Sequence, residues 1–172
     1  MRKTVAIAGL GAIGLPVARA LDAGIPGMRL IAVAARDQVS ARERLASFAN
    51  PPSIVRVADL AQAHIVVEAA PAAIFDDIAI PAIEAGRTLV AASAGALLSR
   101  MHLVRRAEET GVRIIIPTGA LLCLDAVRAA AEGGVNSVAI ETRKPPAGLD
   151  GAPNPPYGPH RTAQGFRRQR LR

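Results

Sequence analysis

Three glycines near the start of the chain have the spacing of a phosphate-binding turn. Gly9, Gly11 and Gly14 follow the pattern G-x-G-x-x-G within the segment VAIAGLGAIG, between a short apolar run and a helical pattern. The first glycine of such a turn permits a tight bend, the second lets a diphosphate approach the backbone, and the third allows close packing of helix on strand. Free N–H groups at the helix start, here those of Ala12 and Ile13, attract the anion. The pattern predicts a dinucleotide-binding turn, with a purely structural glycine turn as the alternative.

The residues after the second apolar run bear on the choice of dinucleotide. Arg36 and Asp37 lie in the segment AVAARDQ, about twenty residues beyond the glycines, where an acid would bind the ribose hydroxyls of NAD. Arg36 suits the 2′-phosphate of NADP instead, because a guanidinium is a permanent cation with several donors. An exposed loop charge at Arg36, and NAD binding through Asp37, are the alternatives. The sequence predicts NADP or NAD as the cofactor and favours NADP.

Small and hydroxyl-bearing residues follow the later apolar runs. Ala70 comes after Glu68 in VVEAAP, and it is small enough for a cofactor to lie against its backbone. Ser93 and Thr118 each open a helical pattern, so they either offer donors at the carboxyl edge of a sheet or serve as N-caps. We predict cofactor contacts at Ala70 and Ser93. Glu68 is either an acid on the nicotinamide side or an ordinary strand-end acid.

No group of residues in the sequence forms a catalytic or metal-binding pattern. Cys123 has no base near it in the sequence, so we interpret it as a small core residue. His64 and His102 lie at the start of an element and on a helix, and we interpret them as structural or exposed. The His, Cys, Asp and Glu residues do not have the spacing of metal ligands. We therefore assign no catalytic and no metal-binding residue.

Strand and helix patterns alternate along the chain. The strand patterns span residues 3–9, 28–36, 53–57, 64–70, 87–93, 112–119 and 135–144. The helical patterns span residues 12–24, 40–49, 71–86, 99–110 and 120–134. Ser40, with Glu43 three residues later, predicts the N-cap of the second helix. Such alternation requires right-handed crossovers, and it predicts a parallel, doubly wound α/β sheet of the Rossmann type.

Composition limits the classes of protein to which the chain can belong. Of the 172 residues, 51% are apolar and only 2% are aromatic, as expected for buried parallel strands under alanine-rich helices. The apolar runs stay below the roughly 18 residues of a membrane span, so we expect no membrane partner and no signal peptide. The single cysteine excludes an internal disulfide and makes the cytoplasm the expected location.

Basic residues concentrate in the last twenty positions. The net charge is +7, but five of the 21 Lys and Arg residues and none of the 14 acidic residues follow Pro153, so the rest of the chain carries only +2. The tail lacks the interleaved aromatic residues of single-strand binders, and a nucleic-acid partner is not favoured. Because the tail is rich in Pro, Gly and Arg and has no periodicity, we predict that residues 153–172 are disordered and are an out-of-frame product.

Several segments resemble the L-aspartate dehydrogenases. These are GLGAIG, VVEAA, AASAGAL, IPTGALLCLDAVRAAAEGGVNSV and ETRKPPAGLDGAP, and the resemblance runs from about Lys3 to Pro153. It implies oxidation of L-aspartate to iminoaspartate with NAD or NADP, a step that supplies NAD biosynthesis. It also implies that Ala120 contacts the cofactor on the nicotinamide side and that Lys144 lies at the crossover to a second domain. The alternatives are a homoserine dehydrogenase-like or dihydrodipicolinate reductase-like enzyme, and a non-enzymatic nucleotide- or nucleic-acid-binding module.

The chain departs from that family after the segment GAP. The family continues there into a mixed α/β domain for substrate binding and dimerisation, which supplies the catalytic histidine, and His160 lies in no comparable motif. We expect a dinucleotide-binding domain over residues 1–142, the start of a crossover over 143–152 and the tail over 153–172. Without the second domain, we expect dinucleotide binding with little or no turnover, and no homodimer of the family type.

Overall fold

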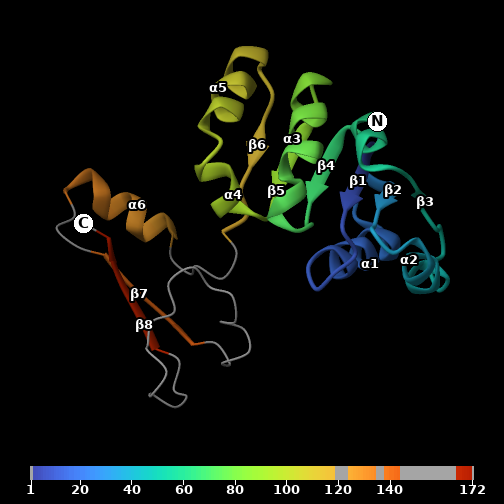
Figure 1. The fold of residues 1–172 in the computed structure, drawn as a ribbon, viewed down its shortest axis with the longest axis horizontal. Helices are drawn as coiled ribbons and strands as arrows, with labels where there is room; N and C mark the ends of the chain where they lie inside the picture. The colour runs from blue at the N-terminus through green and yellow to red at the C-terminus, as the bar shows by residue number, and fades with distance from the viewer. Residues whose placement is uncertain (1, 119–123, 135–137, 144–165, 172) are drawn as a thin grey trace. The chain divides into compact units, whose positions relative to one another are not determined.

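The computed structural model describes residues 2–118, 124–134, 138–143 and 166–171 (Figure 1). The chain divides into two compact units, Met1–Ala120 and Leu121–Arg172. The first unit contains the glycine turn and most of the predicted cofactor-binding residues, so its strands and helices position the candidate site.

The first unit is built on one sheet of six parallel strands. They lie in the order β3-β2-β1-β4-β5-β6, and every neighbouring pair is parallel. Their bounds are Lys3–Ala8 for β1, Met28–Ala34 for β2, Ser53–Ile54 for β3, Ile65–Glu68 for β4, Thr88–Ala91 for β5 and Ile114–Ile115 for β6. The chain moves outward from β1 to β3, returns to place β4 beside β1, and then moves outward in the other direction. The predicted doubly wound parallel sheet is confirmed.

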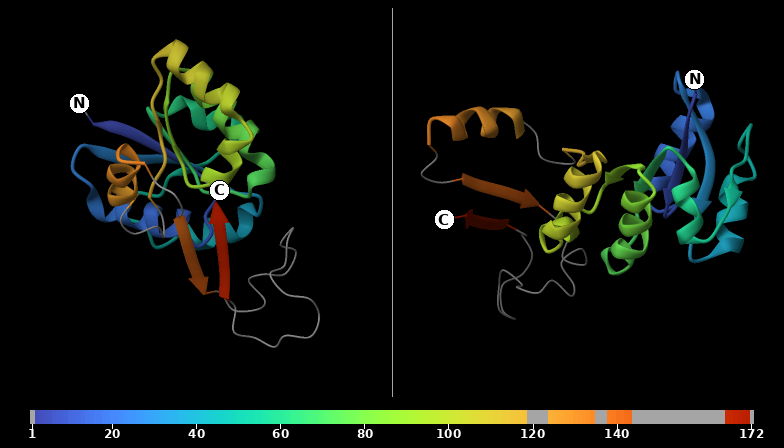
Figure 2. Two further views of the ribbon diagram at one scale, coloured as in Figure 1. Left: turned by 90° about the vertical axis from the view of Figure 1, so that its left-hand side faces the viewer. Right: turned by 90° about the horizontal axis from the view of Figure 1, so that it is seen from above.

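Helices cover both faces of this sheet. They are α1 (Gly14–Gly24), α2 (Gln38–Leu45), α3 (Phe75–Glu84), α4 (Ala94–Leu98) and α5 (Met101–Thr110), with the short 3-10 helices η1 (Val57–Gln62) and η2 (Ala72–Ile74). Core packing places α1 and α2 on one face, and η1, α3 and α5 on the other. In Figure 2, α3 (green) and α5 (yellow) lie side by side. None of the described helices is long and apolar enough to cross a membrane.

The side chains of β1 alternate between two apolar clusters, one on each face of the sheet. Val5 and Ile7 belong to the cluster with α1 and α2, whereas Ala6 and Ala8 belong to the cluster with α3 and α5. Because the two β1 residues on the second face are alanines, the covering helix supplies bulk there, and Phe75 of α3 is fully buried in that cluster. The sheet is therefore buried on both faces, as its continuous apolar strands predict.

Helix α2 begins earlier than predicted, and the predicted N-cap at Ser40 is wrong. Asp37 is the N-cap residue, and its Oδ1 accepts hydrogen bonds from the N–H of Val39 at 3.1 Å and of Ser40 at 3.0 Å. Both Asp and Ser are suitable caps, but an ionised carboxylate also interacts with the positive end of the helix dipole. The helix consequently spans residues 38–45 instead of 40–49.

The second unit contains one helix and a two-stranded antiparallel sheet. Helix α6 spans Leu124–Glu132, and strand β7 (Val138–Arg143) pairs with β8 (Phe166–Leu171). The sequence predicts β7 as part of the parallel sheet and no regular structure at β8, so the structure differs from the prediction in both places. A free strand edge presents N–H and C=O groups with which another extended segment can pair, whatever its side chains. Residues 144–165 lie outside the described residues.

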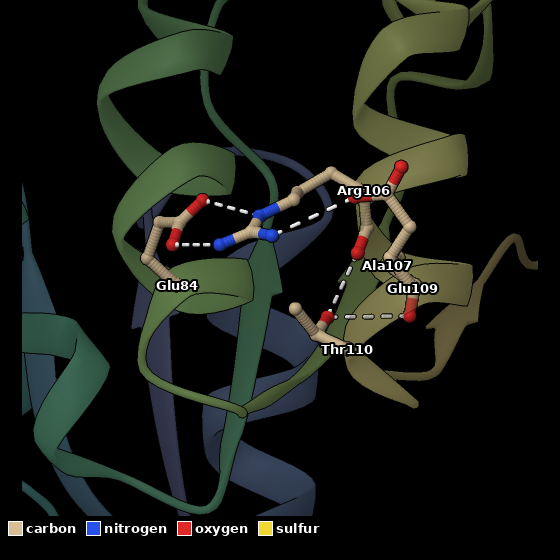
Figure 3. Close-up of polar contacts among 5 residues, drawn as sticks. All are labelled: Glu84, Arg106, Ala107, Glu109 and Thr110. Atoms are coloured by element: carbon tan, nitrogen blue, oxygen red, sulfur yellow. Dashed lines mark hydrogen bonds and ion pairs between the residues drawn. The ribbon is translucent and has the colours of Figure 1, made fainter.

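An ion pair joins α3 to α5 on the surface of the first unit (Figure 3). Arg106 donates from Nε to Oε1 of Glu84 and from Nη2 to Oε2, each at 2.9 Å. Nη1 of the same guanidinium lies 3.6 Å from Oε2 of Glu109. The two hydrogen bonds from Arg106 favour the ionised carboxylate, so they hold the pKa of Glu84 below its usual value.

We expect the Glu84→Gln variant to melt slightly below the unaltered chain at neutral pH and at the same temperature in acid. A lowered folded-state pKa stabilises the protein above the unfolded value of about 4.3, and this stabilisation is lost as the pH falls through the folded pKa. Both side chains are about half exposed, so solvent screening keeps the effect small. Thermal melting across the acid range measures it, with Glu108→Gln as a control on α5. A difference that stays constant with pH would contradict the expectation.

Candidate functional site

The reversal of strand order brings the ends of β1 and β4 together. The chain continues from β1 to α1 on one face and from β4 to α3 on the other, so the two loops diverge at the carboxyl edge of the sheet, where such folds bind ligands. Backbone hydrogen bonds join the strand ends there. The N–H of Gly9 donates to the carbonyl of Ala34 at 2.8 Å, and the N–H of Ala69 donates to the carbonyl of Ala8 at 2.9 Å. The candidate site is this edge, from the glycine turn to the loops after β4 and β5.

The three glycines of the turn have three different surroundings. Gly9 has a φ of +90°, and a Cβ on it would clash with the carbonyl oxygen of Ala69. A Cβ on Gly14 would clash with the carbonyl oxygen of Gly9 and lie 3.3 Å from the side chain of Ile7. A Cβ on Gly11 would meet no atom within 4 Å. Gly9 and Gly14 therefore close the turn and pack it, whereas Gly11 exposes the backbone to open space.

The first turn of α1 offers unused backbone donors. Ile13 is the N-cap residue and makes no side-chain cap hydrogen bond. Among the described residues, no protein group accepts a hydrogen bond from the N–H of Ala12 or Ile13. Orphan N–H groups at the positive end of a helix form an anion-binding site. Together with the open space at Gly11, these predicted residues fit the diphosphate of a dinucleotide.

A hollow of about 260 Å³ lies beside this turn. Its lining consists of Leu10, Gly11, Ala35, Arg36, Asp37, Ser40, Ala41 and Arg44. Arg36 is exposed just after the carboxyl end of β2, where it is accessible to a phosphate as predicted. Arg44 is a second cation at the same hollow that the sequence reasoning missed, and its Nη1 donates to the carbonyl of Leu10 at 2.6 Å. Helical spacing could have indicated Arg44, because it lies four residues after Ser40 and residues four apart share one face of a helix.

Glu68 is fully buried at the end of β4, with 0% of its surface exposed. Its Oε1 accepts hydrogen bonds from the N–H of Ala70 at 3.2 Å and from the hydroxyl of Ser93 at 2.9 Å, and its Oε2 accepts one from the N–H of Ser93 at 2.9 Å. Ser93 occupies the N-cap position of α4 but makes no side-chain cap hydrogen bond. Its interpretation as a side-chain N-cap is therefore wrong, because the hydroxyl donates its hydrogen bond to the nearby carboxylate.

The remaining residues singled out in the sequence do not extend this site. His64 lies at the opposite edge of the sheet, where its Nδ1 is 2.6 Å from Oγ1 of Thr4, and His102 is exposed on α5. Thr118 is exposed after β6. The structure does not describe Ala120, Cys123, Lys144 and His160. Within the described residues, no three His, Cys, Asp or Glu side chains are grouped so that they would hold a metal ion.

We expect Gly14→Ala to destabilise the chain by about 1–3 kcal/mol, because the atom that its Cβ would meet is backbone and cannot move aside. Gly11→Ala is the matched control, since its methyl group points into open space. It is expected to leave the free energy of unfolding unchanged while weakening dinucleotide binding. Urea denaturation of both variants measures the first effect. A Gly14→Ala chain as stable as the unaltered one would contradict the packing described for the turn.

Comparisons with known proteins agree with this geometry. The family described as "Homoserine dehydrogenase, NAD binding domain" matches residues 9–117. L-aspartate dehydrogenase 3 of Bordetella bronchiseptica is 46% identical over 151 residues, which cover 87% of this chain and 56% of that protein. L-aspartate dehydrogenase of Bradyrhizobium diazoefficiens is 47% identical over 150 residues, which cover 87% of this chain and 53% of that protein. The chain thus spans about half the length of these curated relatives.

A solved structure shows the same fold at low sequence identity. The myo-inositol 2-dehydrogenase of Lactobacillus plantarum has a TM-score of 0.62 and 16% identity, covering 87% of this chain and 48% of that chain. The Rossmann-type fold and the predicted resemblance are both confirmed. The chain belongs to the family described as "Homoserine dehydrogenase, NAD binding domain", and it is similar to the curated L-aspartate dehydrogenases over most of its length.

Proposed function

We propose that this chain binds NADP or NAD at the edge between β1 and β4, as the dinucleotide-binding part of an enzyme that oxidises L-aspartate to iminoaspartate. The observation that carries the proposal is the first turn of α1, where open space at Gly11 meets donors of Ala12 and Ile13 that no described protein group uses. The identity of 46–47% to curated L-aspartate dehydrogenases supports the substrate.

Three groups of described residues are assigned to three parts of the dinucleotide. The N–H groups of Ala12 and Ile13 hold the diphosphate, and the hollow with Arg36 takes the adenosine half. Ala70 and Ser93, in the loops after β4 and β5, face the nicotinamide half, where the family resemblance also places Ala120. A nicotinamide held there would supply the acceptor for the hydride that leaves Cα of the substrate.

The same residues offer little for the proton transfer that must accompany hydride loss. Oxidation of the amine needs a base to take its proton, and a positioned base contributes about 10²–10⁴-fold. The carboxylate of Glu68, at the end of β4, is buried and already accepts three hydrogen bonds. We therefore propose that these residues bind the dinucleotide and that they alone give little or no turnover.

The hollow beside the turn favours NADP over NAD. Arg36 and Arg44 bring two cations to it, which suits a 2′-phosphate. Asp37 is the acid that would hold the ribose hydroxyls of NAD, but its Oδ1 accepts two backbone hydrogen bonds at the start of α2. Turning this carboxylate toward a ribose would leave the helix uncapped, at a cost of about 0.5–2 kcal/mol.

Calorimetric titration with NADP and NAD tests the binding function, and aspartate-dependent reduction of the dinucleotide, followed by absorbance, tests turnover. We expect binding of a dinucleotide with little or no aspartate-dependent reduction. Failure to bind either dinucleotide would refute the proposed site. Robust turnover by the 172-residue chain would refute the statement that these residues lack a base.

We expect Arg36→Ala to weaken NADP binding about tenfold or more, the loss typical of a hydrogen bond to a charged group, and to change NAD binding much less. Arg42→Ala is the matched control, because Arg42 is an exposed arginine of the nearby helix α2 that does not line the hollow. The ratio of the two dissociation constants is the quantity to compare. An equal loss for NADP and NAD would contradict a role for Arg36 in binding the 2′-phosphate.

A further inference from the structure

We propose that Glu68 is a positioning residue that holds the two loops facing the nicotinamide half of the dinucleotide, and so sets the affinity for that half without contacting it. The inference rests on the proposed dinucleotide site and adds a residue to it. Among the described residues of known burial, Glu68 is the one charged or polar residue that is buried.

Burying a carboxylate at the end of β4 costs free energy that its contacts must offset. Burial removes its hydration, and within the described residues no cation lies within ion-pair distance of it. Three hydrogen bonds, donated by Ala70 and Ser93, offset the lost hydration of the carboxylate. An apolar side chain at the end of β4 would be cheaper to bury, but it would leave these donors without an acceptor.

The three hydrogen bonds connect the loop after β4 with the loop after β5, and among the described residues no other side-chain hydrogen bond joins these two loops. Ala70 follows β4 and Ser93 follows β5, and the backbone carbonyl of Glu68 also accepts from the N–H of Ala92 at 3.0 Å. In the sheet register Glu68 lies between Ala8 of β1 and Ala91 of β5. Its carboxylate thus fixes the loops of two neighbouring strands at the ligand-binding edge.

The loop that Glu68 fixes also presses on the glycine turn. A Cβ on Gly9 would lie 3.2 Å from Cα of Ala70, so the backbone of the two segments is in close contact. The adenosine hollow lies beyond this contact, along β2 and α2, and none of its lining residues bonds to Glu68. Loss of the Glu68 hydrogen bonds should therefore disturb the nicotinamide half of the site and spare the adenosine half.

The sharpest variant is Glu68→Gln, which keeps the shape and replaces one acceptor oxygen with an NH₂ donor. That NH₂ must face either the N–H of Ser93, which now donates to Oε2, or the N–H of Ala70 and the hydroxyl of Ser93, which now donate to Oε1. Ser93→Ala is a milder variant, because it removes the hydroxyl donor and leaves both backbone donors in place.

The test is calorimetric titration of the full chain and both variants with NADP and with 2′,5′-ADP, which carries only the adenosine half. We expect Glu68→Gln to weaken NADP binding about tenfold or more, and Ser93→Ala to weaken it less, with 2′,5′-ADP binding unchanged in both. Binding of 2′,5′-ADP also reports that the adenosine half is folded. If Glu68→Gln does not fold, the same comparison on Ser93→Ala decides.

Two results would overturn the proposal. Unchanged NADP affinity in the folded variants would show that the loops do not depend on Glu68. Equal losses for NADP and 2′,5′-ADP would show that Glu68 supports the whole unit and not one half of the site. If the unaltered chain binds neither 2′,5′-ADP nor NAD, the failure is a distinct one, because it would refute the dinucleotide site itself and the proposal with it.

Discussion

The close contact between the turn after β1 and the loop after β4 is the constraint on which the site depends. Gly9 adopts a φ of +90° directly against the carbonyl of Ala69, and Gly14 packs against the carbonyl of Gly9. A side chain at either glycine would separate β1 from β4 or lift α1 from the sheet. Because both contacts are to backbone, neighbouring side chains cannot relieve them. The position of the helix start, and hence of its free N–H groups, follows from these two contacts.

The charges around this edge are arranged so that an anion meets donors. Arg36 and Arg44 bring two cations to the hollow, and the first turn of α1 contributes the positive end of its dipole. Two acids at this edge accept backbone hydrogen bonds, Asp37 at the start of α2 and Glu68 from the loops after β4 and β5. Each carboxylate stabilises local structure, and its hydrogen bonds offset the repulsion that it would exert on a phosphate.

The fold and the glycine turn could be predicted from the sequence because both depend on local patterns. The spacing of Gly9, Gly11 and Gly14 and the alternation of apolar runs are properties of short segments. The start of α2 was harder, because Asp37 and Ser40 are both good caps and a capping-box pattern favours the second. Arg44 bonds to the carbonyl of Leu10, which is 34 residues away in the sequence, and no local pattern predicts that contact.

Predictions about contacts between segments far apart in the sequence failed for a different reason. The hydroxyl of Ser93 bonds to Glu68, which is 25 residues away, and no local pattern reports such a pair. The pairing of β7 with β8 likewise depends on which extended segment reaches a free edge. Sequence patterns identify strands and helices well, but they do not identify the partners of polar groups that meet only in the folded chain.

The most direct measurement is an amide ¹H–¹⁵N correlation spectrum of the labelled chain titrated with NADP. Diphosphate binding at the start of α1 should change the environment of the N–H groups of Gly11, Ala12 and Ile13 more than that of any other N–H group. We predict the largest shift changes at these three residues, with smaller ones at Ala70 and Ser93. Unchanged resonances of residues 11–13 at saturating NADP would contradict the proposal that this edge binds the dinucleotide.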